Sequence, residues 1–118
     1  MEQPKQMAKP AQRSYSRYAR EAAELLGLMI HTARIERDLT VGDVAERAGV
    51  SRGLVHRIEK GEMGSSIGAV FEIAAIVGLR LFETGPTTLT RHLSMEREKV
   101  TLLPKSVRTG MTKVKDDF

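Results

Sequence analysis

The side chains best suited to chemistry in this sequence are basic, and they cluster between residues 52 and 60. The cluster consists of Arg52, His56, Arg57 and Lys60. Glu59 is the only acidic residue from Arg47 to Lys60, so this stretch is locally positive within an otherwise acidic middle of the chain. Cations gathered in this way attract phosphate groups, and a planar guanidinium can hold two acceptor atoms at once. The spacing therefore predicts a binding site for a polyanion.

The residue types needed for catalysis or metal binding are missing or badly spaced. The chain has no cysteine, which excludes disulfides, thiolate ligands and cysteine nucleophiles. The three histidines, His31, His56 and His92, lack the spacing of metal ligands. No glycine-rich segment continues into Gly-Lys-Ser or Gly-Lys-Thr, and there is no nucleophile elbow. We therefore expect no enzyme, no metal site and no cofactor, and we expect His56 at the rim of the polyanion site.

The charges divide the chain into three segments. Residues 1–20 hold five basic residues and one acidic residue, residues 21–83 hold seven and ten, and residues 84–118 hold seven and four. Basic ends are compatible with a nucleic-acid partner, although they are equally a means of keeping a protein soluble. The longest apolar run, residues 25–30, is too short to span a membrane. We therefore expect a soluble cytoplasmic protein without a membrane partner.

The element before the basic cluster is a long amphipathic helix. Apolar residues at helical spacing predict it from about Ser14 to Arg37, after a disordered basic arm of residues 1–13. Its inward stripe consists of Ala22, Leu26, Met29, Ile30 and Ala33. This helix would supply one wall of the core.

The basic cluster itself lies on the second of two short helices. Thr40 can cap the first of them, with Asp43 completing a capping box, and Ser51 can cap the second. Gly49 supplies the left-handed conformation that a tight turn between them requires. The inward residues would be Val44, Ala45 and Ala48 on the first helix, and Val55 and Ile58 on the second. Two short helices joined by residues 49–51 have the spacing of a helix-turn-helix.

The segment after the basic cluster predicts a further helix and a strand. A helix capped by Ser66 should run from Ile67 to about Val77, and its second half is apolar nearly all round. Such a helix needs a second buried side, which another copy of the chain would supply. Alternation over residues 79–83 predicts a short strand that pairs with the same segment of that copy. The dimerisation residues would be Ile73, Ile76, Val77, Leu79 and Leu81. Residues 84–118 are expected to be mostly a flexible basic tail, with at most a short helix over residues 89–99.

The run LTVGDVAERAGVSRGLVHRIEKG, with LGLMIHTARIERD before it, resembles the lambda-repressor/Cro-like (XRE) helix-turn-helix domains. The resemblance covers about residues 15–83 and lies in the Leu-Thr cap, the Ala-Gly-Val-Ser turn and the Arg-Ile-Glu-x-Gly exit. It implies an all-α, five-helix domain over residues 14–83 that regulates transcription as a homodimer on a palindromic operator. The DNA-binding residues that it implies are Thr40, Val41, Ser51, Arg52, Gly53, His56, Arg57 and Lys60.

The resemblance also assigns roles within this set. Arg52 and Gly53 occupy the main base-reading positions, and Arg57 occupies a base or phosphate position one turn later. An arginine can hold O6 and N7 of guanine bidentately. Gly53 stands where Ser or Thr is usual, and Val41 stands where many members have Gln. These departures leave more of the readout to the two arginines and to DNA shape.

Other charged residues have structural explanations. In the family that the chain resembles, the counterparts of Arg34 and Glu59 form an internal ion pair between the first helix and the end of the recognition helix. Arg47 is either a solvated surface charge or a phosphate contact. Lys60 is placed to act as a charge at a helix C-terminus as well as to contact a phosphate.

The continuation IVGLRLFETGP resembles HipB-type antitoxins, in which a short strand after the last helix pairs across the dimer. This resemblance implies an autorepressor that neutralises a HipA-type kinase toxin. Two alternatives stay open: a stand-alone XRE repressor without a toxin, and a protein-interaction module for which DNA is incidental. The segment VTLLP and the terminal DDF are either a toxin-binding or DNA-wrapping segment that orders on binding, or a disordered extension.

Overall fold

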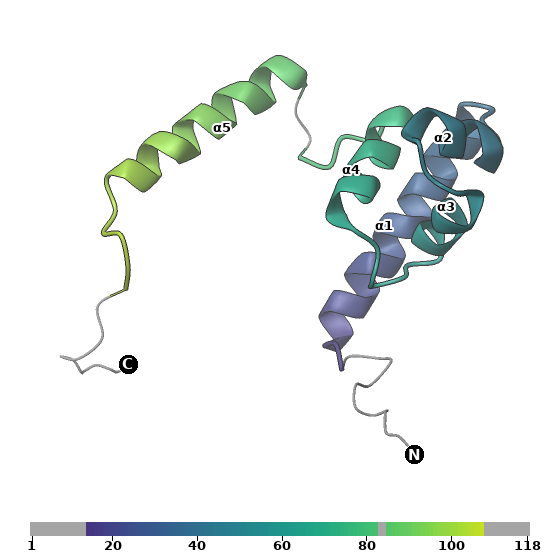
Figure 1. The fold of residues 1–118 in the computed structure, drawn as a ribbon, viewed down its shortest axis with the longest axis horizontal. Helices are drawn as coiled ribbons and strands as arrows, with labels where there is room; N and C mark the ends of the chain where they lie inside the picture. The colour runs from purple at the N-terminus through teal and green to yellow at the C-terminus, as the bar shows by residue number, and fades with distance from the viewer. Residues whose placement is uncertain (1–13, 83–84, 108–118) are drawn as a thin grey trace. The chain divides into compact units, whose positions relative to one another are not determined.

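The computed structural model describes residues 14–82 and 85–107 of the chain (Figure 1). These residues form five helices: α1 (Arg17–Glu36), α2 (Val41–Ala48), α3 (Arg52–Glu59), α4 (Ile67–Ile76) and α5 (Pro86–Thr101). The chain divides after Leu81 into two compact units, with α1 to α4 in the first unit and α5 in the second. The expected all-helical class is confirmed for the residues that the structure describes.

Each helix of the first unit begins at a hydroxyl cap. The side chains of Ser16, Thr40, Ser51 and Ser66 each accept a hydrogen bond from the backbone N–H three residues later, at 2.9–3.3 Å. At α2 the cap is reciprocal, because the Thr40 backbone N–H also donates to Asp43 Oδ2 at 2.9 Å. Hydrogen bonds from the backbone and hydroxyl of Thr40 hold the pKa of the Asp43 carboxyl below its usual value. The capping box expected from the sequence is therefore present.

The core is aliphatic and is built from all four helices of the first unit. Figure 1 shows α2, α3 and α4 gathered around α1. The largest fully buried side chains are Ile30, Val44, Val55, Ile73 and Val77. Gly27 of α1 allows a close approach between two helices: a Cβ there would lie 2.6 Å from the carbonyl oxygens of both Ile58 and Glu59 in α3. The absence of a side chain at residue 27 therefore sets the distance between α1 and α3.

Two of the residues expected to dimerise belong to this core. Ile73 and Val77 are fully buried within a single chain, and Ile76 is half-buried against the same cluster. The buried side of α4 thus packs within the single chain, chiefly against α2. Ile73 and Val77 are therefore core residues of the single chain, and their expected part in a dimer interface stays a prediction. On α4 the side chain of Ile67 is the most exposed large hydrophobic one.

The short strand expected over residues 79–83 is absent from its described part in this single chain. Leu79 and Arg80 have no regular structure, and Leu81 and Phe82 form a turn. Residue 83 lies outside the described residues. A strand requires a hydrogen-bonded neighbour, and residues 14–82 and 85–107 of one chain offer none.

The second unit contains a longer helix than the sequence predicted. Helix α5 spans Pro86–Thr101, where only a short helix over residues 89–99 was expected. Pro86 occupies its first turn, where a missing N–H costs nothing. None of its residues is buried. Among the described residues no helix is both long and apolar enough to cross a membrane.

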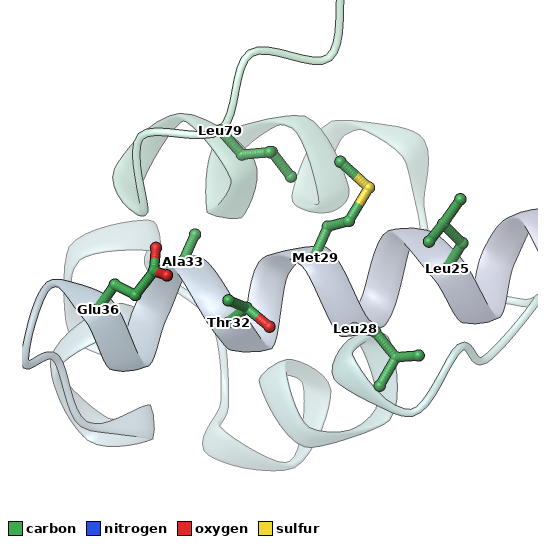
Figure 2. Close-up of a pocket in the computed structure, with 7 residues that line it drawn as sticks. All are labelled: Leu25, Leu28, Met29, Thr32, Ala33, Glu36 and Leu79. Carbon is green, nitrogen blue, oxygen red and sulfur yellow. The ribbon is translucent and has the colours of Figure 1, made fainter.

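A shallow apolar hollow of about 440 Å³ lies on the first unit, along the outer side of α1 (Figure 2). Figure 2 shows Met29 and Leu79 reaching into the space between α1 and the segment that follows α4. The hollow is lined by Leu25, Leu28, Met29, Thr32, Ala33, Glu36 and Leu79. Leu25 and Leu28 are more than half exposed, so this face carries apolar surface that the single chain leaves open to solvent.

Candidate nucleic-acid interface

The turn between α2 and α3 fixes the two helices that carry the basic cluster. Gly49 follows α2 in the left-handed conformation, with φ 70°. The next N–H, of Val50, returns to the carbonyl oxygen of Ala45 at 3.0 Å, and Ser51 then caps α3. This arrangement closes α2 and opens α3 within three residues, as the sequence predicted. It also leaves the N-terminus of α3 at the surface, because Ser51, Arg52 and Gly53 are all exposed.

Helix α3 divides into a buried side and an exposed side. Val55, Ile58 and Glu59 are buried. The exposed side carries Arg52, Gly53, His56 and Arg57, and Lys60 is exposed directly after the helix. The residues expected to contact DNA on α3 therefore share one solvent-facing surface. Their shared placement gives this surface the charge and the donors that a phosphate-lined groove would attract.

The residues expected on α2 differ in what they can offer to a ligand. Thr40 is exposed at the N-terminus of α2, where backbone N–H groups favour an anion. Val41 is half-buried and packs against the core, so only part of its side chain is open to a ligand. Arg47 is exposed near the end of α2 and has no ion pair within the described chain. The exposed groups that α2 offers are thus its N-terminal backbone N–H groups, Thr40 and Arg47.

Arg52 lies against the start of α2 without a polar partner among the described residues. A Cβ at Gly42 would lie 3.0–3.2 Å from atoms of the Arg52 guanidinium, which places that group directly over the backbone of α2. No hydrogen bond among the described residues therefore uses the N–H donors of Arg52. Sequence reasoning missed Gly42, although a glycine inside a short helix is a signal of close approach.

Arg57 is held differently, because it has a carboxylate partner. Its Nε donates to Glu62 Oε1 at 3.2 Å, and Ser65 Oγ donates to the same oxygen at 3.1 Å. A Cβ at Gly53 would lie 3.3 Å from Arg57 Nη1, so the guanidinium reaches back along α3 toward the first turn. Glu62 was not expected in the site. It follows the helix as part of a loop, and no spacing rule applied to the sequence would have paired it with Arg57.

A buried polar network ties the end of α3 to α1. Arg34 Nε donates to Glu59 Oε2 at 2.6 Å, and Arg34 Nη2 donates to Glu59 Oε1 at 3.2 Å. Arg34 Nη1 also donates to the Leu39 carbonyl oxygen at 2.8 Å. His31 Nδ1 lies 2.8 Å from Glu59 Oε1, a partner that the sequence did not suggest. This is the internal pair that the family resemblance implied for Arg34 and Glu59, and it leaves neither charge free for a ligand.

The electrostatics of Glu59 follow from this network. Burial of the carboxyl raises its pKa, but hydrogen bonds and charges from Arg34 and His31 act in the opposite direction and outweigh burial. The pKa of Glu59 therefore lies below its ordinary value of 4.5, and the group is ionised at neutral pH. The network fixes the C-terminal end of α3 and so the direction of its exposed side.

Helices α2 and α3 thus meet at a tight turn and present a basic surface from the second of the two. Residues 25–81 match the family model of a helix-turn-helix domain. No curated protein matches the chain. In a helix-turn-helix domain the second helix lies in the major groove of DNA and the helix before it crosses the backbone. By this likeness α3 corresponds to the second helix of the motif and α2 to the helix before it.

Proposed function

We propose that the chain is a sequence-specific DNA-binding regulator of transcription that reads the major groove with α3. The observation that carries the proposal is the pair of exposed arginines on one side of α3. Arg52 stands at the first helical position with its donors unengaged, and Arg57 stands one turn later with Nη1 near Gly53 and neither Nη group in a hydrogen bond among the described residues. Each can hold a guanine bidentately, a contact that discriminates by about 1–3 kcal/mol.

The proposal also accounts for the positions without base-reading side chains. Gly53 has no side chain, and Val41 faces the core. Thr40 and Ser51 cap helix starts, where N–H groups suit phosphates. His56 and Lys60 are exposed beside the arginines, where they add contacts to the groove rim or backbone. Sequence readout is therefore concentrated in Arg52 and Arg57, and DNA shape supplies the remainder.

The test is a titration of the purified protein against the DNA upstream of its own gene and against scrambled duplex of equal length, at several salt concentrations. The proposal expects affinity for the natural DNA to exceed that for scrambled DNA by about 10³-fold or more, with a steep fall as salt rises. Equal, weak binding to both duplexes would contradict it. Such a result would favour the alternative of a protein-interaction module.

We further propose that the regulator acts as a homodimer on a palindromic operator. The support is the apolar hollow on α1, which the single chain leaves open to solvent. Leu79 lines this hollow, and Leu81 follows two residues later in the chain. Two half-sites should then lie about 34 Å apart or a multiple of that distance.

Replacement of Leu28 by Glu should lower the sedimenting mass of the protein, because Leu28 is 53% exposed and its replacement leaves the core intact. Ile67→Glu is the control, since Ile67 is exposed on α4. A monomeric wild-type protein would contradict the homodimer.

The most specific form of the proposal is an autorepressor that serves as the antitoxin of a HipA-type kinase. Its support is the resemblance of residues 76–86 to HipB-type antitoxins, together with α5, a helix with no buried residue. An isolated helix of this length is marginally stable in water, so a partner protein would stabilise it. Co-expression with a kinase encoded beside the gene should yield a stable complex that lacks kinase activity. A stand-alone repressor would copurify with no such kinase.

A further inference from the structure

The end of α3 brings the backbone of Glu62 next to the backbone of Arg57. Gly61 adopts φ 83°, and its N–H donates to the Ile58 carbonyl oxygen at 3.0 Å. The N–H of Glu62 then donates to the carbonyl oxygen of Arg57, also at 3.0 Å. These two bonds form the Schellman motif that closes many helices. The separation of the two side chains is therefore set by the helix end itself.

The side chains of these two residues meet on the surface. Arg57 Nε donates to Glu62 Oε1 at 3.2 Å, with the two side chains 54% and 43% exposed. An ion pair this exposed contributes little to stability. Ser65 Oγ donates to the same carboxylate oxygen at 3.1 Å, so Glu62 is held by the loop as well as by Arg57. A gain in folding stability therefore does not explain why Arg57, Glu62 and Ser65 are joined by hydrogen bonds here.

The contact with Glu62 uses only one edge of the Arg57 guanidinium. Glu62 engages Nε, and Arg57 Nη1 lies over Gly53, where a Cβ would come within 3.3 Å. Within the described residues no hydrogen bond engages Nη1 or Nη2 of Arg57, and Nη1 lies beside Gly53, the residue next to Arg52. Two adjacent N–H donors of one guanidinium are what a guanine edge accepts.

We propose that Glu62 is a positioning residue that orients Arg57 for base recognition, with Ser65 holding the carboxylate in place. This rests on the proposed DNA-binding function and extends it. Glu62 touches no base; it fixes the plane of a guanidinium that does, and so reduces the side-chain freedom that Arg57 must lose on binding. Arg52 has no such partner, so ordering of its side chain must come from DNA.

The proposal predicts two opposite effects of the substitution Glu62→Gln. Removal of one negative charge raises affinity for any duplex, because phosphate attraction is independent of sequence. Release of Arg57 lowers discrimination between bases. The ratio of affinities for the correct and the incorrect base pair should fall by about 1.5- to 5-fold, which is the range for an exposed ion pair. The matched control is Glu46→Gln, which removes the same charge from an exposed residue of α2 that has no ion pair within the described chain. In that variant both affinities should rise together and the ratio should not change.

The experiment begins with selection of a preferred site by the wild-type protein from a random duplex library. Single base-pair changes in that site then identify the pair at which wild type discriminates and Arg57→Ala does not. At that base pair, Glu62→Gln should reduce discrimination in the wild-type background and leave it unchanged in the Arg57→Ala background. An unchanged or increased ratio in the single variant would overturn the positioning role.

Two further measurements separate this proposal from the one on which it rests. If wild type selects no sequence, the proposed function fails; if it selects a site but Glu62→Gln keeps full discrimination, only the positioning role fails. Without DNA, the NMR signal of the Arg57 Nε–H should exchange more slowly with water in wild type than in Glu62→Gln, while the melting temperatures agree. Equal exchange in the two proteins would show that Glu62 does not order Arg57, and would overturn the proposal directly.

Discussion

Replacement of Arg34 by Met tests the network that fixes the end of α3. The side chains of Arg34 and Glu59 are 9% and 7% exposed, so the variant leaves the Glu59 carboxylate buried with His31 as its remaining partner. It also leaves the Leu39 carbonyl oxygen without its side-chain donor. Methionine keeps much of the aliphatic length of arginine, so the loss is mainly electrostatic. Breaking a buried pair on one side costs about 3–5 kcal/mol. That is a large part of the 5–15 kcal/mol by which domains are typically stable.

The cost of this substitution should depend on pH. In wild type the pKa of Glu59 is lowered, so the ionised carboxylate contributes stability that is present above its ordinary value of 4.5 and is lost as pH falls through the folded-state value. In Arg34→Met the main cause of that lowering is gone, and protonation of Glu59 removes an unpaired buried charge. The difference in unfolding free energy between the two proteins should therefore be largest above about pH 5 and should shrink toward pH 3.

The assay is urea unfolding followed by circular dichroism at a series of pH values. Arg47→Met is the control, because Arg47 is exposed and has no ion pair within the described chain. This control should change the unfolding free energy by less than about 0.5 kcal/mol. A loss below about 1 kcal/mol in Arg34→Met, or a difference between the proteins that does not vary with pH, would refute the stabilising role of the network.

Three glycine substitutions and one cap substitution test the fold by thermal and urea unfolding. Gly27→Ala should cost about 3 kcal/mol or more, because its Cβ would meet two backbone carbonyls that cannot move independently. Gly68→Ala, in open space on α4, should instead stabilise by about 0.5–1 kcal/mol; destabilisation there would count against the helix. Gly49→Ala should cost about 1–2 kcal/mol through its positive φ alone, since no atom lies near its Cβ. Thr40→Ala should cost about 1 kcal/mol, and an unchanged midpoint would contradict the capping box at α2.

The local signals of the sequence predicted helix limits well because they act within one turn. Ser16 caps α1 two residues after the predicted start, and Thr40, Ser51 and Ser66 cap the helices that they were expected to cap. Spacing also identified Val55 and Ile58 as core residues. Each of these predictions depends only on a residue and its near neighbours along the chain.

The features that the sequence did not predict depend on which surfaces meet. Apolar periodicity showed that α4 is apolar on more than one side, but it could not show that the core of the same chain already covers Ile73 and Val77. Gly27 and Gly42 act through backbone distances to other helices, which no spacing along the sequence encodes. The pairing of Arg57 with Glu62 depends on a helix end and a loop conformation. Long-range packing and side-chain direction therefore account for the differences between the sequence predictions and the structure.

The most direct test of the central claim is the DNA affinity of the double variant Arg52→Ala, Arg57→Ala. Its control is Arg20→Ala, Arg80→Ala, which removes two exposed arginines outside α2 and α3. The account predicts that the first variant keeps its melting temperature but binds the natural upstream DNA no better than scrambled duplex, whereas the control retains the preference. If the Arg52 and Arg57 variant keeps wild-type affinity for the natural DNA at matched salt, α3 does not read DNA and the account is wrong.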